Sequence, residues 1–227
     1  MNIDNCVIIG TTIFLGVIAL FVPYLAELLK RKLFKPVLRI NFNLGPPSCH
    51  RTFWSNTPDE LKTVFYFRFE VENKGKTTCR NVENSLENIW RYNSANQPVK
   101  IEDFTPVNLK WSVNYEKTQQ SINPERRLYC NIGHLPTREF QILASKLINP
   151  NGYSGDDLRL ELDLMTLLNV QLNCLPPGKF VLQINTYSEN YKTVISYFRI
   201  SWTGKWSEDY EVLFQEMVIE KINNPFQ

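Results

Sequence analysis

The chain has 227 residues, of which 43% are hydrophobic, and its 25 basic and 23 acidic side chains leave a formal net charge of +2. The numbers of basic and acidic side chains are nearly equal, which argues against the clustered basic face that a nucleic-acid groove needs. We therefore expect no nucleic-acid partner. The length leaves room for one domain with its own hydrophobic core beside a membrane anchor.

The first predicted element is an uncharged, largely apolar run from Val7 to Ala26. At the α-helical rise, such a run spans roughly 30 Å, which matches the hydrocarbon thickness of a bilayer. A cleaved secretory signal carries basic residues before its apolar core, whereas residues 1–6 hold an acid and neither Lys nor Arg. The sequence therefore predicts a short tail over residues 1–6 and an uncleaved transmembrane helix over residues 7–29.

Basic side chains follow this predicted helix, and none precedes it. They are Lys30, Arg31, Lys32, Lys35 and Arg39, and residues 30–36 form a basic juxtamembrane segment. By the positive-inside rule, this bias predicts that the rest of the chain lies in the cytoplasm. The cluster can also pair with anionic head groups of the lipid bilayer, the first partner that we expect. The predicted location is the inner or plasma membrane, with a single pass.

From residue 37 to residue 206, alternating apolar and polar side chains predict β-strands. In the clearest one, residues 62–73, the apolar positions are Phe65, Phe67, Phe69 and Val71. A turn follows, in which we expect Gly75 to supply a positive φ. Further strands are predicted over residues 37–44, 77–86, 126–132, 139–143, 158–164, 180–187 and 194–202. No long helical pattern separates them, which favours an antiparallel Ig-like β-sandwich.

The last predicted element is a short amphipathic helix over residues 207–222, packed on the sandwich. Ser207 can cap it, and its apolar stripe consists of Tyr210, Leu213, Phe214 and Met217. The predicted fold class is therefore mainly β: an N-terminal transmembrane helix, an antiparallel Ig-like β-sandwich and a short C-terminal helix.

The segment from Val64 to Val82 carries a resemblance. Its alternating aromatic residues run into Val71-Glu72-Asn73-Lys74-Gly75, which resembles the strand–turn–strand unit of immunoglobulin-like modules of the CARDB and FxLYD kind. Pro176-Pro177-Gly178 before Phe180 is similar to the start of a late strand in such modules. The chain also resembles uncharacterised bacterial single-pass membrane proteins that end in Trp-x-Gly-x-Trp, here residues 202–206. The resemblance implies a fold and transfers no binding residues.

Two Cys/His pairs supply the donor atoms of a structural zinc site: Cys49 with His50, and Cys130 with His134. Neither pair has zinc-finger spacing, and Cys130 alternates inward with Ile132. Buried free cysteines are the common alternative in a reducing compartment. We therefore predict no metal and no cofactor, and whether the two pairs bind a metal stays an open question at this point.

Catalytic motifs are missing from the sequence. It contains no Gly-x-Ser-x-Gly elbow, no His-Glu-x-x-His and no phosphate-binding loop. The paired carboxylates Glu161 and Asp163 are expected on a solvated strand face. We predict no catalytic residues and a protein that is not an enzyme.

Trp54 and Trp111 lie in two long, polar connections, over residues 45–61 and 93–125, where functional contacts concentrate. We expect these two side chains to contact a protein partner. The predicted function is a non-catalytic, membrane-anchored interaction or tethering module. The alternative is a single-pass effector whose sandwich binds a small molecule and drives clustering in the bilayer.

Overall fold

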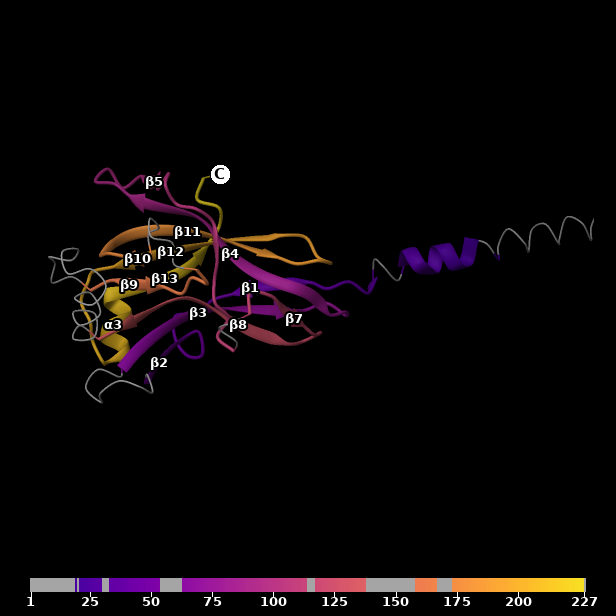
Figure 1. Cartoon of the computed structure of the whole chain (residues 1–227), viewed down its shortest axis with the longest axis horizontal. Helices are drawn as coiled ribbons and strands as arrows, with labels where there is room; N and C mark the ends of the chain where they lie inside the picture. Colours follow the sequence, from indigo (N-terminus) through magenta and orange to yellow (C-terminus); the bar gives the residue numbers. More distant parts are fainter. Residues whose placement is uncertain are drawn as a thin grey trace, which may run out of the picture.

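The computed structural model describes residues 19, 21–29, 33–53, 63–113, 117–137, 158–166 and 173–226. Within these residues, the strands form two antiparallel sheets that lie on either side of one hydrophobic core (Figure 1). The prediction of a mainly β, antiparallel architecture is thus confirmed.

Sheet I has six strands among the described residues, with β3 and β8 at its centre. The order is β1-β3-β8-β9-β10, and β2 pairs with the part of β3 that β1 leaves free. Their bounds are β1 Leu38–Asn41, β2 Cys49–Phe53, β3 Thr63–Asn73, β8 Arg127–Pro136, β9 Leu160–Leu162 and β10 Cys174–Leu175.

Sheet II has seven strands within the described part of the chain, in the order β13-β12-β11-β4-β5, with β6 and β7 also paired to β4. Their bounds are β4 Cys79–Tyr92, β5 Pro98–Lys100, β6 Val107–Asn108, β7 Gln120–Ile122, β11 Gly178–Tyr187, β12 Val194–Trp202 and β13 Met217–Ile222. The long strand β4 therefore pairs with three short strands at different points along its length.

The alternation in β3 places its apolar side chains in the core. Phe65, Phe67 and Phe69 are fully buried, and the Phe69 ring lies 5.4 Å from the ring of Phe198 in the opposite sheet. The observed strands over residues 63–73, 178–187 and 194–202 agree, to within two residues at each end, with the ranges predicted from the sequence. A period of two is the clearest β signal, and it is regular along β12 and through the middle of β3, whereas β11 has buried runs at 180–182 and 184–186.

Four short strands lie where the sequence predicted connections: β2, β5, β6 and β7. Each has only two to five residues, too few for a period of two to be recognised. They exist because long neighbours, β3 and β4, offer them hydrogen-bonding edges. The strand predicted over residues 139–143 lies outside the described residues.

The predicted C-terminal helix is wrong in its second half. Helix α3 covers Tyr210–Glu216, and the chain then turns directly into β13. Met217 and Ile219 are buried with a period of two, and β13 pairs with β12 from Trp202↔Met217 onward. Met217 fits both the helical stripe and the strand pattern, which is why the sequence alone extended the helix. Asp209, and not Ser207, caps α3 by accepting a hydrogen bond from the Glu211 N–H.

Lys221 links the two sheets beside β13. Its Nζ donates to the carbonyl oxygen of Ile40 in β1 at 2.6 Å, and burial lowers the pKa of its ammonium group. A lysine on an edge strand is a common means of preventing further strand addition. Here it also ties β13 to β1.

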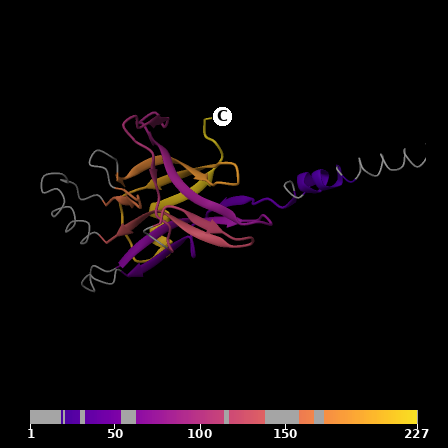
Figure 2. The same cartoon turned by 45° about the vertical axis from the view of Figure 1, so that its right-hand side comes forward.

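Residues 21–29 are helical and stand clear of both sheets in Figures 1 and 2. Their apolar side chains contact little: Phe21, Tyr24 and Leu25 are 65%, 64% and 58% exposed. Among the described residues, no helix is both long and apolar enough to cross a bilayer. Residues 7–18 and residue 20 of the predicted transmembrane helix lie outside the described residues.

Candidate functional site

The chain from residue 33 to residue 37, which we call the linker, runs from the helical segment to β1 and is fixed to the turn between β3 and β4. The Lys74 N–H donates to the carbonyl oxygen of Val37 at 2.8 Å, and the Lys76 N–H donates to that of Lys35 at 3.1 Å. The Lys76 ammonium lies 5.5 Å from the centre of the Phe34 ring. The linker is therefore bonded to the sandwich from residue 35 onward.

Asn73 holds this junction together from inside. Its Oδ1 accepts from the N–H groups of Val37 and Gly75, at 3.1 and 2.9 Å. Its Nδ2 donates to the carbonyl oxygens of Thr77 and Ile122, both at 2.8 Å. Asn73 is fully buried, and its bonds to Gly75 and Ile122 are buried with it, whereas those to Val37 and Thr77 are partly buried. One amide thus joins the linker, the β3–β4 turn and β7.

Gly75 has a different role from the one predicted. The positive-φ glycines among the described residues are Gly45, Gly178 and Gly204, so Gly75 is not needed for a left-handed backbone. A Cβ at Gly75 would lie 2.3 Å from the Lys35 carbonyl oxygen and 2.5 Å from the Pro36 Cα. Gly75 is required because the linker passes directly over it.

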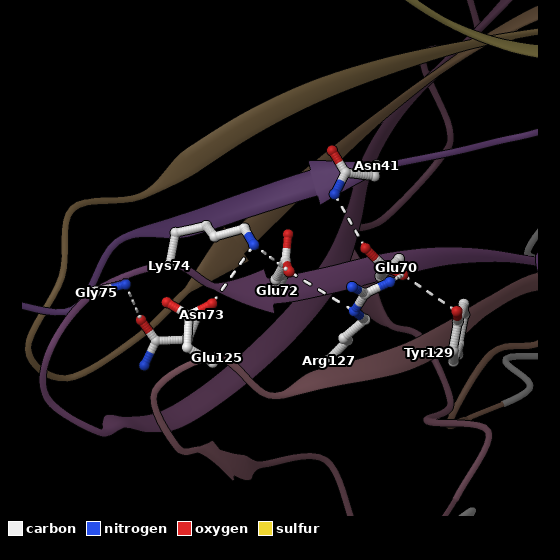
Figure 3. A network of polar contacts seen from close by, with 9 residues as sticks. All are labelled: Asn41, Glu70, Glu72, Asn73, Lys74, Gly75, Glu125, Arg127 and Tyr129. Carbon is white, nitrogen blue, oxygen red and sulfur yellow. Dashed lines mark hydrogen bonds and ion pairs between the residues drawn. The ribbon is translucent and has the colours of Figure 1, made fainter.

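A charge network covers the outer side of sheet I next to this junction (Figure 3). Glu70 accepts from the Asn41 side chain at 3.0 Å and from the Tyr129 hydroxyl at 3.1 Å. The Arg127 guanidinium lies 3.5 Å from Glu70 and 3.6 Å from Glu72. These contacts connect β1, β3 and β8 across the sheet.

Glu72 is the most enclosed carboxylate of this network, with a side chain only 6% exposed. Lys74 donates to it at 2.8 Å and also lies 3.5 Å from Glu125 (Figure 3). The hydrogen bond from Lys74 lowers the pKa of Glu72, and the same bond raises the pKa of Lys74. Both groups are therefore charged at neutral pH. Their ion pair holds the β3–β4 turn against sheet I.

Further along the same side of sheet I, two histidines flank one tyrosine. His50 in β2 is stacked on Tyr66 in β3, with ring centroids 5.9 Å apart, and Tyr66 lies 5.4 Å from His134 in β8. His134 continues the row to β9, where its Nε2 lies 3.3 Å from Glu161. Its Nδ1 lies 2.9 Å from an oxygen of Asp163.

The two histidines differ in charge because their neighbours differ. Burial by itself lowers the pKa of His134, but the hydrogen bonds to Asp163 and Glu161 outweigh it and raise that pKa to about 9. Burial and the nearby Arg68 lower the pKa of His50. Asp163 is buried, contrary to the solvated position predicted for it. Sequence reasoning missed this cluster because its members lie on separate strands.

The two Cys/His pairs do not converge. Cys49 and Cys130 are fully buried on the core side of sheet I, whereas His50 and His134 lie on its outer side. Burial raises the pKa of Cys49 to about 12, so its thiol stays protonated. Within the described residues, no group of three or more His, Cys, Asp or Glu side chains could hold a metal ion.

The predicted partner contacts fare differently. Trp111 is fully buried, and its indole N–H donates to the carbonyl oxygen of Thr118 at 2.9 Å. Its backbone forms an isolated antiparallel β-bridge with Cys130. The prediction of an accessible contact is therefore wrong for this residue. Trp54 lies outside the described residues, as do Lys30, Arg31 and Lys32, whereas Lys35 and Arg39 are exposed.

The unit that carries the sequence resemblance is β3, the turn after it and the start of β4, and the linker is bonded to that turn. The two strands lie in different sheets and are not paired with each other. The alternating aromatic residues of this unit account for the core, and its Asn-Lys-Gly turn accounts for the junction. The family assignment itself stays a prediction. Comparisons of the chain with family models, with curated proteins and with solved structures found no match.

Proposed function

We propose that this protein is a non-catalytic, membrane-anchored interaction module. In this proposal, residues 7–29 span the bilayer and an Ig-like β-sandwich is presented at its cytoplasmic face. The observation that carries the proposal is the junction: an exposed apolar helical segment leads, through a linker fixed by Asn73 and Gly75, into the body of the sandwich. Such a connection suits a protein that holds its domain at a set height above a membrane.

The exposure of the helical segment supports the anchor. Phe21, Leu25 and their apolar neighbours up to Leu29 pack against neither sheet, at a cost of about 25 cal/mol for each Å² left in water. A lipid environment removes that cost. The basic residues predicted to flank the helix favour a cytoplasmic sandwich.

The state of His134 supports a non-catalytic role. Both of its ring nitrogens face carboxylates, and its raised pKa keeps the imidazolium form at neutral pH. A general base needs a free lone pair near its operating pH, which this histidine lacks. The cluster is better suited to holding β8 and β9 together.

Partner contacts are proposed at the end of the sandwich opposite the linker. There, the Tyr210 hydroxyl of α3 accepts from the Arg51 N–H of β2, so helix and strand form one corner. Phe53 in β2 is 65% exposed and Val212 in α3 is 45% exposed. Exposed apolar side chains on a rigid corner are suitable contacts for a protein partner.

Topology and membrane extraction test this function together. A C-terminal tag on the full chain should be protected when protease is added outside intact cells, and the chain should stay in the membrane pellet after alkaline carbonate. The double variant Phe21→Asp/Leu25→Asp should be released, because a charged side chain costs up to about 3 kcal/mol near the centre of a span and two of them weaken insertion together. The matched control is Val99→Asp/Ile195→Asp, at sandwich positions of similar exposure.

Release of the unaltered chain by carbonate would overturn the anchor. Digestion of the tag would overturn the cytoplasmic location while leaving the anchor in place. Equal release of both double variants would show that the apolar helix has no special role.

A further inference from the structure

The end of the sandwich next to the linker is built from three turns, and the β3–β4 turn is hydrogen-bonded on one side to the β7–β8 turn and on the other to the β11–β12 turn. The Glu125 N–H of the β7–β8 turn donates to the Asn73 carbonyl oxygen at 2.8 Å. Asn190 of the β11–β12 turn donates to the Thr78 carbonyl oxygen at 2.9 Å. Figure 1 shows these turns on the side from which the helical segment leaves. They form one continuous surface around the linker.

This surface carries exposed basic side chains. They are Lys35 from the linker and one residue from each turn: Lys76, Arg126 and Lys192, which together we call the linker-end basic surface. The carboxylates nearby are occupied, since Glu125 pairs with Lys74 and Glu189 pairs with Arg80. None of the ion pairs among the described residues involves the four members of this surface.

The junction fixes how far this surface can lie from the helix. Leu29 and Lys35 are six residues apart, so a fully extended chain between them reaches at most about 20 Å. From Lys35 onward the backbone is bonded to the turn, without slack. The head-group layer of a bilayer is itself about 5–8 Å thick. An anchored helix therefore keeps the start of the linker-end surface, at Lys35, no more than about 12–15 Å above the head groups.

Phe34 adds an apolar component to the same surface. Its ring is 50% exposed and lies beneath the Lys76 ammonium. Segments that lie at a membrane interface combine Lys and Arg with apolar side chains such as Phe and Leu.

From these observations, we propose that the linker-end basic surface binds anionic lipid head groups, so that the sandwich rests on the membrane in one orientation. This inference rests on the proposed anchoring and extends it from the helix to the folded domain. It adds a lipid-binding role for Lys76, Arg126 and Lys192, which are distant in sequence from the basic juxtamembrane segment.

Hydrogen exchange on the full chain in lipid nanodiscs tests this proposal. One nanodisc contains only phosphatidylcholine, and the other contains phosphatidylcholine with phosphatidylglycerol. We expect amides of residues 74–76, 125–126 and 189–192 to exchange roughly tenfold more slowly in the anionic nanodisc. Amides of α3, at the opposite end, should exchange equally in both.

The variant Lys76→Glu/Arg126→Glu/Lys192→Glu should abolish the difference between the two nanodiscs. The matched control is Lys100→Glu/Lys179→Glu/Lys205→Glu, which reverses three exposed charges away from the linker and should retain it. Thermal unfolding of each variant checks that the sandwich is intact. Equal exchange in the two nanodiscs, or equal loss in both triple variants, would overturn the lipid contact.

Failure of the anchor gives a different result. A chain that does not enter nanodiscs at all would contradict the proposed function. The lipid contact would then be decided by flotation with anionic vesicles: binding that the first triple variant loses and the control keeps would support it, and equal binding of both would overturn it.

Discussion

The missing Cβ of Gly75 leaves the space that the Lys35 carbonyl oxygen occupies, at 2.3 Å from where that Cβ would be. Gly75→Ala should therefore push the linker off the turn and lower the free energy of unfolding by about 1–3 kcal/mol. Denaturant unfolding followed by tryptophan fluorescence measures this loss. Lys76→Ala, one residue away in the same turn and exposed, should leave the midpoint nearly unchanged. An unfolding midpoint for Gly75→Ala equal to that of the unaltered chain would contradict the tight contact.

Asn73→Ala should be among the most destabilising polar substitutions. It removes four hydrogen bonds and leaves the carbonyl oxygen of Ile122 buried without this donor, at a cost of roughly 2–4 kcal/mol. Asn73→Asp keeps the acceptor for Val37 and Gly75 but loses both donors, so it should also destabilise. The exposed Asn123→Ala is the control, and calorimetry should show a much smaller change in Tm for it.

Because the pKa of His134 is raised in the folded protein, we expect the protein to lose stability in mild alkali. Its pKa is about 9 in the folded protein and 6.5 without the fold, so its contribution is complete below pH 6.5 and disappears as the pH rises through 9. The loss amounts to at most about 3 kcal/mol. His134→Gln should flatten this dependence, whereas His50→Gln should preserve it.

The same assignment can be read directly by NMR, since the chain contains only two histidines. One imidazole should titrate below its ordinary pKa and the other near 9. Two titrations close to 6.5 would show that Asp163 and Glu161 do not hold a proton on His134.

Trp111→Ala should unfold the core instead of removing a surface contact. The ring is fully buried, and loss of a buried aromatic side chain typically costs about 3–5 kcal/mol. Trp111→Phe keeps most of the volume and should cost less, although it loses the bond to Thr118. A stable Trp111→Ala protein that has lost a partner would reinstate the surface role.

The sequence was sufficient where one strand carries its own signal. Phe65, Phe67 and Phe69 alternate through most of β3, so both the strand and its buried side could be predicted. It was insufficient for β13, where Met217 satisfies the helical and the strand pattern equally. Only pairing with β12 decides between them, and that pairing is not local.

The candidate site depended on non-local contacts even more. Gly75 was predicted to shape a turn, but its role comes from the linker, some forty residues earlier in the chain. Asp163 was predicted to face solvent because the alternation of Glu161 and Asp163 along the chain does not reveal that His134, on a neighbouring strand, contacts Asp163. Polarity places a residue on one side of a strand, whereas its partner depends on how the strands are ordered in the sheet.

The junction also determines how the protein responds to force. Figure 1 shows the helical segment, the linker and β1 following one another in nearly the same direction. A pull on the helix would therefore act along β1, whose bonds to β3, from Leu38↔Asn73 to Asn41↔Glu70, run across the direction of pull. These bonds would share the load in shear and would not open one at a time. Under the proposed anchoring, a pull on the helix would thus load the attachment of the sandwich along β1, the direction in which its strand pairing resists in shear.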